Sequence, residues 1–310
     1  MRFARVRSGL EESSDEVTAI ALNASGKILF TSGDPDRPLY YRSAIKPFQA
    51  LAAARAGLQL PTEHLAITCA SHTGYPVHIG LVRQILNDAG LSANDLKCAR
   101  DRPDSLSADR ALIERGNSHE QRILHNCSGK HAGWLAACAW IGWETETYLD
   151  NSHPIQVSIR EIVNEFTGID PQPVGVDGCG APAARGTIRG LARAFTRLDI
   201  DEELRPIARA VSRFGSLTSD NITGVGRFAA VWGGRQKGGA EGSFVAVRHG
   251  VAIATKSNSG DSNAAVAGAL HVADTLGMLT DGMRNALAPQ FNPPVLGGGV
   301  TVGRLELVAS

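Results

Sequence analysis

The chain has 310 residues, of which 43% are apolar and 20% charged, a composition that fits a globular protein and excludes a disordered or collagen-like chain. Lys plus Arg and Asp plus Glu each total 31, so the sequence lacks the basic excess of a general nucleic-acid binder. No uncharged apolar run reaches the roughly 18 residues of a membrane-spanning helix. We therefore expect neither nucleic acid nor a membrane among the partners.

Cysteine usage favours a reducing compartment. The segment Met1–Leu10 is too charged for a secretion signal, and the five cysteines are an odd number. We expect a cytoplasmic protein with reduced thiols, in which a conspicuous cysteine is a candidate metal ligand or reactive group.

Lysine is scarce among the cations. Only six of the 31 are lysines, namely Lys27, Lys46, Lys97, Lys130, Lys237 and Lys256. A lysine can lose its proton when it is buried, whereas an arginine cannot. The positions of these few lysines are therefore of interest for chemistry, even though a codon bias would explain their small number.

The N-terminal part of the chain mixes strands and helices. Val17–Leu22 and Lys27–Phe30 flank a turn, which predicts a β-hairpin. The alanine-rich segment Ser43–Ala56 predicts a helix. Leu65–Cys69 predicts a short buried strand, and the apolar spacing over Pro76–Gly90 predicts a second helix.

The central part, from about residue 76 to 215, is predicted to be rich in helices. Beyond Gly90 they are expected over Ala108–Arg115, Lys130–Trp140, Pro154–Gly168, Ala183–Thr196 and Glu202–Phe214. Ser152 is expected to cap the helix that begins at Pro154, since a serine at that position accepts hydrogen bonds from the first helical N–H groups. Gly168 is expected to end the same helix.

The C-terminal part returns to strands. Ser243–Val247 and Val251–Thr255 predict a second hairpin, Ala264–Leu276 a helix, and Val295–Val308 a glycine-rich strand region. Strands from both ends are expected to pair in one antiparallel sheet with helices packed around it. The sequence thus predicts an α+β fold in a single catalytic domain over residues 1–310.

The sharpest chemical signal is Ser43-Ala44-Ile45-Lys46. Three residues make about one helical turn, so Ser43 and Lys46 would share a face. A serine hydroxyl is a weak nucleophile that needs a base, and a lysine becomes one when burial or a second cation lowers its pKa. Penicillin-recognising acylases use a Ser-x-x-Lys pair in this way. Ser43 is therefore a candidate nucleophile, although a pattern with two fixed positions also arises by chance.

A second signal lies in Thr68–Gly74, where the predicted strand runs into small polar residues. Side chains at strand ends often carry function. Ser71 would be able to donate a hydrogen bond to a nucleophile or leaving group, and His72 would be able to act as a base. The alternative is an ordinary turn with Ser71 as a helix cap.

Two cysteines form the third signal. Cys127 precedes a predicted helix, whose dipole favours a thiolate, and Cys179 lies among glycines. Such thiolates would be able to share a zinc ion with His131, with Asp177 or with a neutral Lys130. Because the spacing is not that of a Cys-x-x-Cys pair, two buried structural cysteines are the alternative.

The fourth signal is Lys237-Gly238-Gly239-Ala240-Glu241-Gly242, just before a predicted strand. Glycines let a backbone approach a ligand closely. The lysine would be able to hold a carboxylate or, as a second cation, to favour the neutral form of a catalytic lysine. The alternative is an exposed turn with a solvated lysine. For Lys256, nothing except the scarcity of lysine in this chain suggests a functional role.

Taken together and in order, these segments resemble the asparaginase II family, typified by the rhizobial L-asparaginases. The resemblance covers nearly the whole chain and rests on six segments: Arg42–Pro47, Cys69–His72, Asn126–His131, Asp177–Cys179, Gly224–Phe228 and Lys237–Gly242. It implies a fold like that of the serine β-lactamases and glutaminases. The implied activity is hydrolysis of L-asparagine to L-aspartate and ammonia.

The resemblance also implies roles for individual residues. Ser43 would be the nucleophile and Lys46 its base, with Ser71 and Lys237 as a second Ser–Lys pair for proton transfer. A zinc ion that aids substrate binding would be held by Cys127, Lys130 and Cys179. For the substrate itself, an amino-acid amide, the expected binding residues are Arg42, His72 and Asp177.

Two other interpretations of the sequence are open. One is another Ser–Lys amidohydrolase, like a glutaminase or a β-lactamase, since Tyr75 stands where relatives commonly carry an acidic residue. Another is a zinc or thiol sensor without turnover, built on Cys127 and Cys179. We also expect a homodimer.

Overall fold

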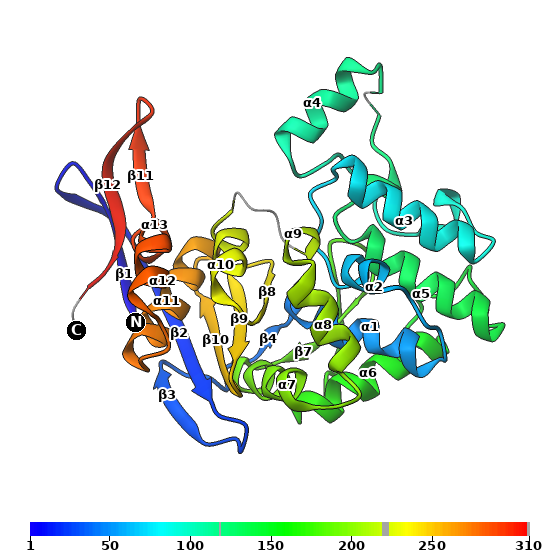
Figure 1. Ribbon diagram of the computed structural model, residues 1–310, viewed down its shortest axis with the longest axis horizontal. Helices are drawn as coiled ribbons and strands as arrows, with labels where there is room; N and C mark the ends of the chain where they lie inside the picture. Colours follow the sequence, from blue (N-terminus) through cyan, green and yellow to red (C-terminus); the bar gives the residue numbers. More distant parts are fainter. Residues whose placement is uncertain (118, 219–222, 309–310) are drawn as a thin grey trace. The chain divides into compact units, whose positions relative to one another are not determined.

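A computed structural model describes residues 1–117, 119–218 and 223–308, which form two compact units (Figure 1). The sheet unit comprises Met1–Ala44, Gly186–Asp201 and Asn221–Ser310. The helical unit comprises Ile45–Arg185 and Glu202–Asp220. The single catalytic domain over residues 1–310 stays a prediction.

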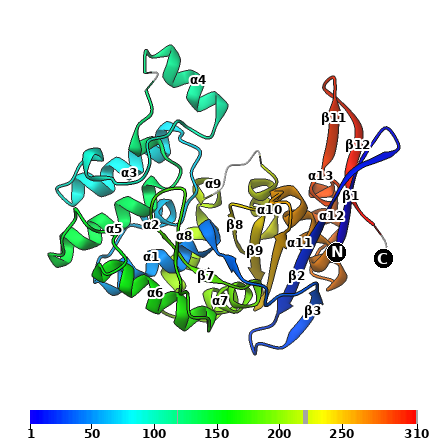
Figure 2. The same ribbon diagram turned by 180° about the vertical axis from the view of Figure 1, so that it is seen from behind.

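The sheet unit is built on eight antiparallel strands in the order β11-β12-β1-β2-β10-β9-β8, with β3 also paired to β2 (Figures 1 and 2). The strands are β1 (Arg2–Arg7), β2 (Leu10–Leu22), β3 (Ile28–Ser32), β8 (Arg235–Gly239), β9 (Ser243–Arg248), β10 (Val251–Ser257), β11 (Pro294–Gly297) and β12 (Val300–Leu307). Strands from both chain ends meet where β1 pairs with β12. The predicted α+β fold with a sheet of N- and C-terminal strands is therefore confirmed.

Helices cover both faces of this sheet. One face packs with α11 in a cluster that includes Phe244 and Ile253. The alternate residues on β9, such as Val245, are buried as well, and α7 packs against β2, β9 and β10. Because successive strand residues point to opposite faces, α7 covers the second face. The helices of this unit are α7 (Ile188–Ile200), α10 (Gly224–Trp232), α11 (Ser262–Thr275), α12 (Asp281–Ala286) and α13 (Ala288–Phe291), and the short strand β4 (Leu39–Tyr40) precedes the exit from the unit.

The helical unit is arranged around α5 (Ser128–Ile141), which is buried from Ser128 to Cys138. Helices α1, α2 and α3 pack against it, and α6 packs against α1. Besides α5, the helices and strands of this unit are α1 (Lys46–Arg55), α2 (Thr62–Thr68), α3 (Pro76–Asp88), α4 (Leu106–Glu114), α6 (Pro154–Thr167), α8 (Arg205–Arg213), α9 (Gly215–Thr218), β5 (Gly175–Val176) and β6 (Pro182–Ala183). In the short strand β7 (Arg185–Gly186) the chain passes from this unit to the sheet unit. A helix that is apolar all round is expected at the centre of a bundle.

Most predicted elements are confirmed within a few residues. Both hairpins are present, as are the helices that correspond to α1, α3, α4, α5, α6, α8 and α11. The first hairpin joins β2 to β3 and the second joins β9 to β10. The C-terminal strand region divides into β11 and β12. Gly90 and Gly168 adopt the positive φ angles expected after helix ends.

Three local predictions are wrong. Leu65–Cys69 is not a strand, because Thr62–Thr68 forms α2; a short buried apolar run does not distinguish the two structures. The cap of α6 is His153 rather than Ser152, since the His153 ring accepts a hydrogen bond from Ile155 N. Helix α7 starts at Ile188 and not at Ala183, because Thr187 is its N-cap.

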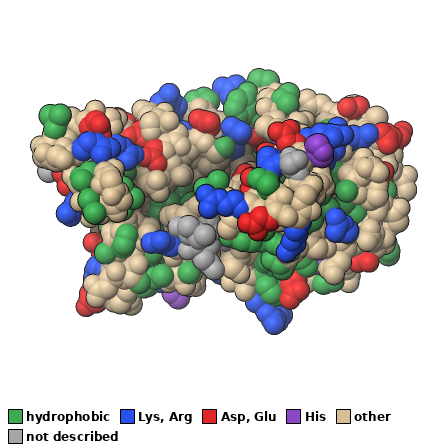
Figure 3. Space-filling model, turned by 90° about the horizontal axis from the view of Figure 1, so that it is seen from above, with side chains coloured by type: hydrophobic (Ala, Val, Ile, Leu, Met, Phe, Trp, Pro, Cys, Tyr) green, Lys and Arg blue, Asp and Glu red, His purple; other side chains and the backbone are tan. Residues whose placement is uncertain are grey.

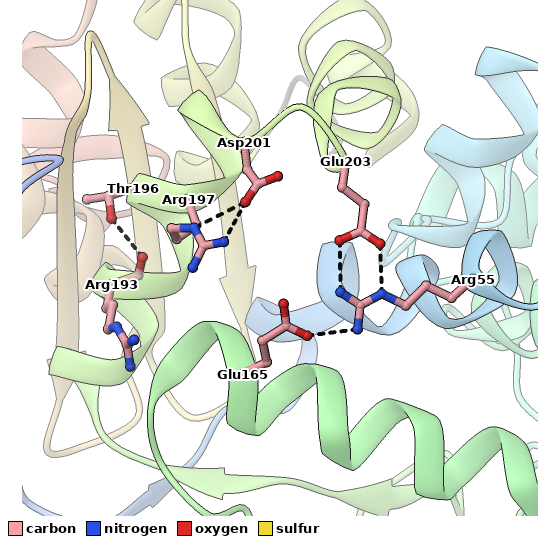
Figure 4. Close-up of polar contacts among 7 residues, drawn as sticks. All are labelled: Arg55, Glu165, Arg193, Thr196, Arg197, Asp201 and Glu203. Carbon is pink, nitrogen blue, oxygen red and sulfur yellow. Dashed lines mark hydrogen bonds and ion pairs between the residues drawn. The ribbon is translucent and has the colours of Figure 1, made fainter.

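Arginine–carboxylate pairs fix helices within each unit (Figure 4). In the helical unit, Arg55 on α1 donates to both carboxylate oxygens of Glu203 at 2.8 Å, and to Glu165 on α6 at 2.8 Å. These hydrogen bonds raise the pKa of Arg55 above its ordinary value. In the sheet unit, Arg197 donates to Asp201 at 2.5 Å just beyond the end of α7.

Surface charge is mixed. On the face drawn in Figure 3, Lys and Arg side chains are scattered among Asp and Glu side chains, as the zero net charge leads one to expect. Within the described ranges, no helix is both long enough and apolar enough to span a bilayer.

Candidate active site

The turn that carries Ser43 is anchored in the sheet unit by Tyr41. The chain passes from β4 into a 3-10 turn over Arg42–Ile45. The Tyr41 ring is fully buried and fills the space beside Gly186, where an added Cβ would lie 2.0 Å from the ring. Its hydroxyl accepts a hydrogen bond from Thr187 N at 3.3 Å. The backbone just before Ser43 is thus fixed to the residues that start α7.

Strand β8 lies directly against the same turn. A Cβ added to Gly239 would lie 3.0 Å from both Ala44 N and Tyr41 O, so any side chain here would press on the backbone of the turn. On the same strand Lys237 is almost completely buried, and its Nζ donates to Gly238 O at 2.8 Å. The alternative of an exposed turn with a solvated lysine is therefore wrong for Lys237. The segment before the predicted hairpin is itself a strand, and it brings a buried lysine into the neighbourhood of the Ser43 turn.

Lys46 and Ser71 are brought together in the helical unit. Lys46 begins α1 and is 0% exposed. Its Nζ donates to Ala70 O at 2.5 Å and to Ser71 Oγ at 3.1 Å, at the end of the chain segment that follows α2. A buried amine in hydrogen-bond contact with a hydroxyl is an arrangement through which a proton is able to pass.

His72 links the Ser71 segment to the start of α5. Its backbone N donates to Asn126 O at 3.0 Å, and its Nε2 lies 2.8 Å from Ser128 Oγ. Because the Ser128 hydroxyl donates to Ile123 O, His72 is the donor to Ser128 and carries its proton on Nε2. Burial lowers the pKa of His72 to about 3, so the ring is neutral. The sequence led us to expect substrate contact here, but the side chain is 1% exposed.

Cys127, Lys130 and Cys179 converge in the helical unit. Cys127 is the N-cap residue of α5, and Cys179 lies in a turn closed by a hydrogen bond from Gly180 N to Asp177 O at 2.8 Å. The two cysteine side chains are hydrogen-bonded to each other. Lys130 Nζ lies 3.3 Å from Cys179 Sγ. Residues that are about fifty positions apart in the chain thus form one buried cluster.

The electrostatics of this cluster favour one shared negative charge on sulfur. The hydrogen bond from Cys179 holds the pKa of Cys127 well below its ordinary value, with the charges of Lys46 and Lys130 adding to the effect. The same hydrogen bond raises the pKa of Cys179. Burial alone would favour a neutral Lys130, but the two sulfurs outweigh it and raise the pKa of this lysine.

The donor set would suit a zinc ion, since zinc in proteins accepts sulfur and nitrogen ligands. Among the residues that the structure describes, no three His, Cys, Asp or Glu side chains cluster well enough to hold a metal, so the predicted zinc site would need the Lys130 amine, in its neutral form, as the third ligand. Of the alternatives, the His131 Nδ1 lies 2.7 Å from the Tyr148 hydroxyl.

A comparison with protein families matches the model of L-asparaginase II over residues 4–307. The chain belongs to the L-asparaginase II family. The resemblance that rests on the six sequence segments is thereby confirmed. A search of curated protein sequences gave no match.

Several solved structures are similar to this asparaginase II chain at low sequence identity. Mglu in its glutamate form has 13% identity and a TM-score of 0.48, over 84% of this chain and 61% of that one. Native Mglu has 16% identity and a TM-score of 0.46, over 86% and 66%. A mutant of the Streptomyces K15 DD-transpeptidase has 15% identity and a TM-score of 0.44, over 84% and 97%. The chain spans less than two thirds of the length of these two Mglu chains.

The two other residues expected to bind the substrate lie in different units. Arg42 precedes Ser43 in the sheet unit with a φ angle of +50°, and Asp177 lies in the Cys179 turn of the helical unit. No local sequence pattern marks Tyr41 or Gly239 as a residue that shapes the Ser43 turn. Their contacts join segments far apart in the chain, and only the Gly-Gly pair after Lys237 hinted at a close backbone approach.

Proposed function

We propose that this protein hydrolyses the side-chain amide of L-asparagine, giving L-aspartate and ammonia through an acyl-enzyme on Ser43. Membership of the L-asparaginase II family supports the reaction. The single structural observation that carries the proposal is the fully buried Lys46, whose Nζ lies 3.1 Å from Ser71 Oγ. A lysine buried in this way is of use to a serine hydrolase as a proton acceptor.

The proposed reaction has two stages. Ser43 Oγ attacks the amide carbon while a neutral Lys46 takes the hydroxyl proton, and backbone N–H groups at the start of α1 stabilise the oxyanion by about 3–4 kcal/mol per donor. Ammonia leaves with a proton supplied through Lys46, Ser71 and Lys237. Water then attacks the acyl-enzyme, and L-aspartate is released as Ser43 recovers its proton. Burial of Lys237 supports its part in this relay.

Substrate binding is assigned to charged residues beside the proposed nucleophile and the cysteine turn. Arg42 would meet the substrate carboxylate and Asp177 its ammonium group. His72, being buried and bonded to Ser128, would position the Ser71 segment rather than touch the substrate. A homodimer in the cytoplasm stays our expectation.

We further propose that Cys127, Lys130 and Cys179 hold a zinc ion. Their convergence and burial support this assignment. When bound, zinc would supply a Lewis acid that helps to bind and orient the amide substrate. In its absence, the three side chains hold one another through the hydrogen bonds described above.

Ammonia release from L-asparagine and L-glutamine, together with the absorbance change of a chromogenic β-lactam, tests the function. We expect turnover of L-asparagine at a kcat/KM at least about tenfold above that of the other two compounds. Preference for glutamine or the β-lactam would instead favour the other Ser–Lys amidohydrolases. No turnover of any compound, together with tight zinc binding, would favour the metal or thiol sensor.

Replacing Gly239 by alanine is expected to lower kcat/KM about tenfold to a hundredfold. The new Cβ would meet the backbone atoms Ala44 N and Tyr41 O at 3.0 Å, and neither is able to rotate away. The Ser43 turn would therefore shift. Gly238→Ala is the matched control, since its Cβ would meet side-chain methyl groups of Val225 at 3.2 Å, which are able to move. Steady-state kinetics and thermal unfolding are measured for both, and equal kinetics would contradict the prediction.

Replacing Cys179 by serine is expected to weaken zinc binding at least about a hundredfold, because a sulfur ligand is lost. Cys138→Ser is the matched control, since Cys138 is buried in the same unit but apart from the cluster's hydrogen bonds. Competition with a chromophoric chelator measures the affinity of each full-length variant. Unchanged zinc affinity in Cys179→Ser would remove this residue from the site.

A further inference from the structure

A pocket that lies wholly within the sheet unit shares Arg42 with the proposed substrate site, but its other lining residues take no part in the proposed reaction. Its volume is about 220 Å³, and it opens between the end of β10, the turn from β8 to β9 and the segment that leads to Ser43. Five charged side chains line it, namely Asp34, Arg37, Arg42, Glu241 and Lys256. A space of this size suits a small ligand rather than a drug-sized one.

One wall of the pocket is held by a buried carboxylate. Asp15 accepts hydrogen bonds from Ser257 Oγ at 2.5 Å, from Ser259 Oγ at 2.7 Å and from Ser259 N at 3.0 Å. These bonds fix the loop that follows β10. Asn258 in that loop accepts a hydrogen bond from Arg37 Nη1 at 2.8 Å, which places the guanidinium over the pocket. Pre-formed walls reduce the entropy lost when a ligand binds.

Lys256 is a cation placed for an anionic ligand. Its Nζ donates to the main-chain carbonyls of Glu241 and Ser257. An ammonium group has three donors, so these two bonds fix its direction and leave one N–H for a ligand. Burial lowers the pKa of Lys256 even though Glu241 and Asp15 are near. Partial removal of a cation from water strengthens its attraction for a bound carboxylate.

The charges around the pocket define the ligand further. Arg37, Arg42 and Lys256 provide three positive charges, and Asp34 and Glu241 provide two negative charges, so the lining is positive by one. A complementary ligand is negative by one and carries charges of both signs. We propose that this pocket binds a small acidic amino acid, with its two carboxylates on the cations and its ammonium group on Glu241.

The position of the pocket connects it to the Ser43 turn. Arg42 lies immediately before Ser43, and Glu241 lies two residues after Gly239, whose backbone contacts that turn. A ligand that bridges Arg42 and Glu241 therefore joins the two segments that shape the turn. The inference shares Arg42 with the proposed function, whereas Arg37, Glu241 and Lys256 take no part in the proposed serine chemistry.

The small number of lysines makes a site-resolved experiment feasible. The full-length protein, labelled with ¹³C at lysine Cε, has six such groups, and Lys256→Met identifies the Lys256 signal. On addition of L-aspartate we expect the chemical shift of that signal to change and to reach saturation, while the chemical shifts of Lys27 and Lys97 remain constant. In Lys256→Met, calorimetry is expected to show the affinity of this binding event reduced at least about tenfold.

A second variant tests the assignment of the ammonium group. Wild-type protein is expected to prefer L-aspartate to succinate, which lacks the amine, by several-fold, and Glu241→Gln is expected to lose that preference. A Lys256 signal that stays still at saturating L-aspartate would overturn the proposal. So would movement of Lys256 together with Lys46 and Lys237 along one saturation curve, since the pocket would then belong to the catalytic centre. The ammonia-release assay is independent of both results.

Discussion

Replacing Ser43 by alanine is expected to abolish ammonia release from L-asparagine, with kcat lowered at least about a thousandfold. The hydroxyl oxygen is the atom that forms the covalent bond in the proposed reaction, and alanine has no atom to replace it. The loss should appear in kcat and not mainly in KM. Mass spectrometry of the wild-type protein, quenched during turnover, should show an added aspartyl group on the peptide that contains Ser43.

The control for this variant is Ser25→Ala, which removes an exposed hydroxyl in the turn before β3. Both variants should fold like the wild type, because Ser43 is only partly buried and a small residue replaces a small one. Undiminished asparaginase activity in Ser43→Ala would refute the serine mechanism. A zinc or thiol sensor would also leave its function intact in that variant.

Replacing Lys46 by arginine is expected to lower kcat about a hundredfold to ten thousandfold, although the positive charge is kept. Arginine does not release its proton in a protein, so it is not able to accept the proton of Ser43. The contacts that Lys46 makes with Ala70 O and Ser71 Oγ are also specific to a single amine. Stopped and steady-state assays of ammonia release measure the effect.

Arginine is larger than lysine, and position 46 is completely buried, so the fold of this variant needs a check. Lys46→Met keeps the length of the side chain without the amine, and it should be as inactive as the arginine variant. Lys97→Arg is the matched control, since Lys97 lies at the surface in an ion pair with Glu146 at 2.5 Å. Activity within a few-fold of wild type in a folded Lys46→Arg would exclude this lysine as the base.

The sequence predicts most reliably those features that a short local pattern specifies. The order of the six family segments led to the family, and the terminal strands led to the antiparallel sheet. The Ser-x-x-Lys pattern points to Lys46 and the segment around Cys127 points to Lys130, and both lysines prove to be buried. In such cases a local pattern and the tertiary structure agree.

The sequence was least informative where tertiary contacts decide the structure. Leu65–Cys69 has the composition of a strand, yet packing against α5 and α8 stabilises it as part of a helical region. His153 caps α6 because its ring happens to reach the first helical N–H groups, whereas Ser152 has the better intrinsic preference. The meeting of Cys127 with Cys179 depends on a turn about fifty residues away, which no local pattern specifies.

The contact between Gly239 and the Ser43 turn has a consequence for interpreting other sequences of this kind. Two backbones touch there, so a Cβ at Gly239 would press on main-chain atoms, whereas a Cβ at Gly238 would meet methyl groups of Val225 that are able to move. A related chain that keeps its serine and lysines but carries any larger residue at the position of Gly239 is therefore expected to hold its nucleophile in a different place. One residue outside the reacting groups thus becomes a criterion for separating working amidohydrolases from relatives that have kept the fold but lost the reaction.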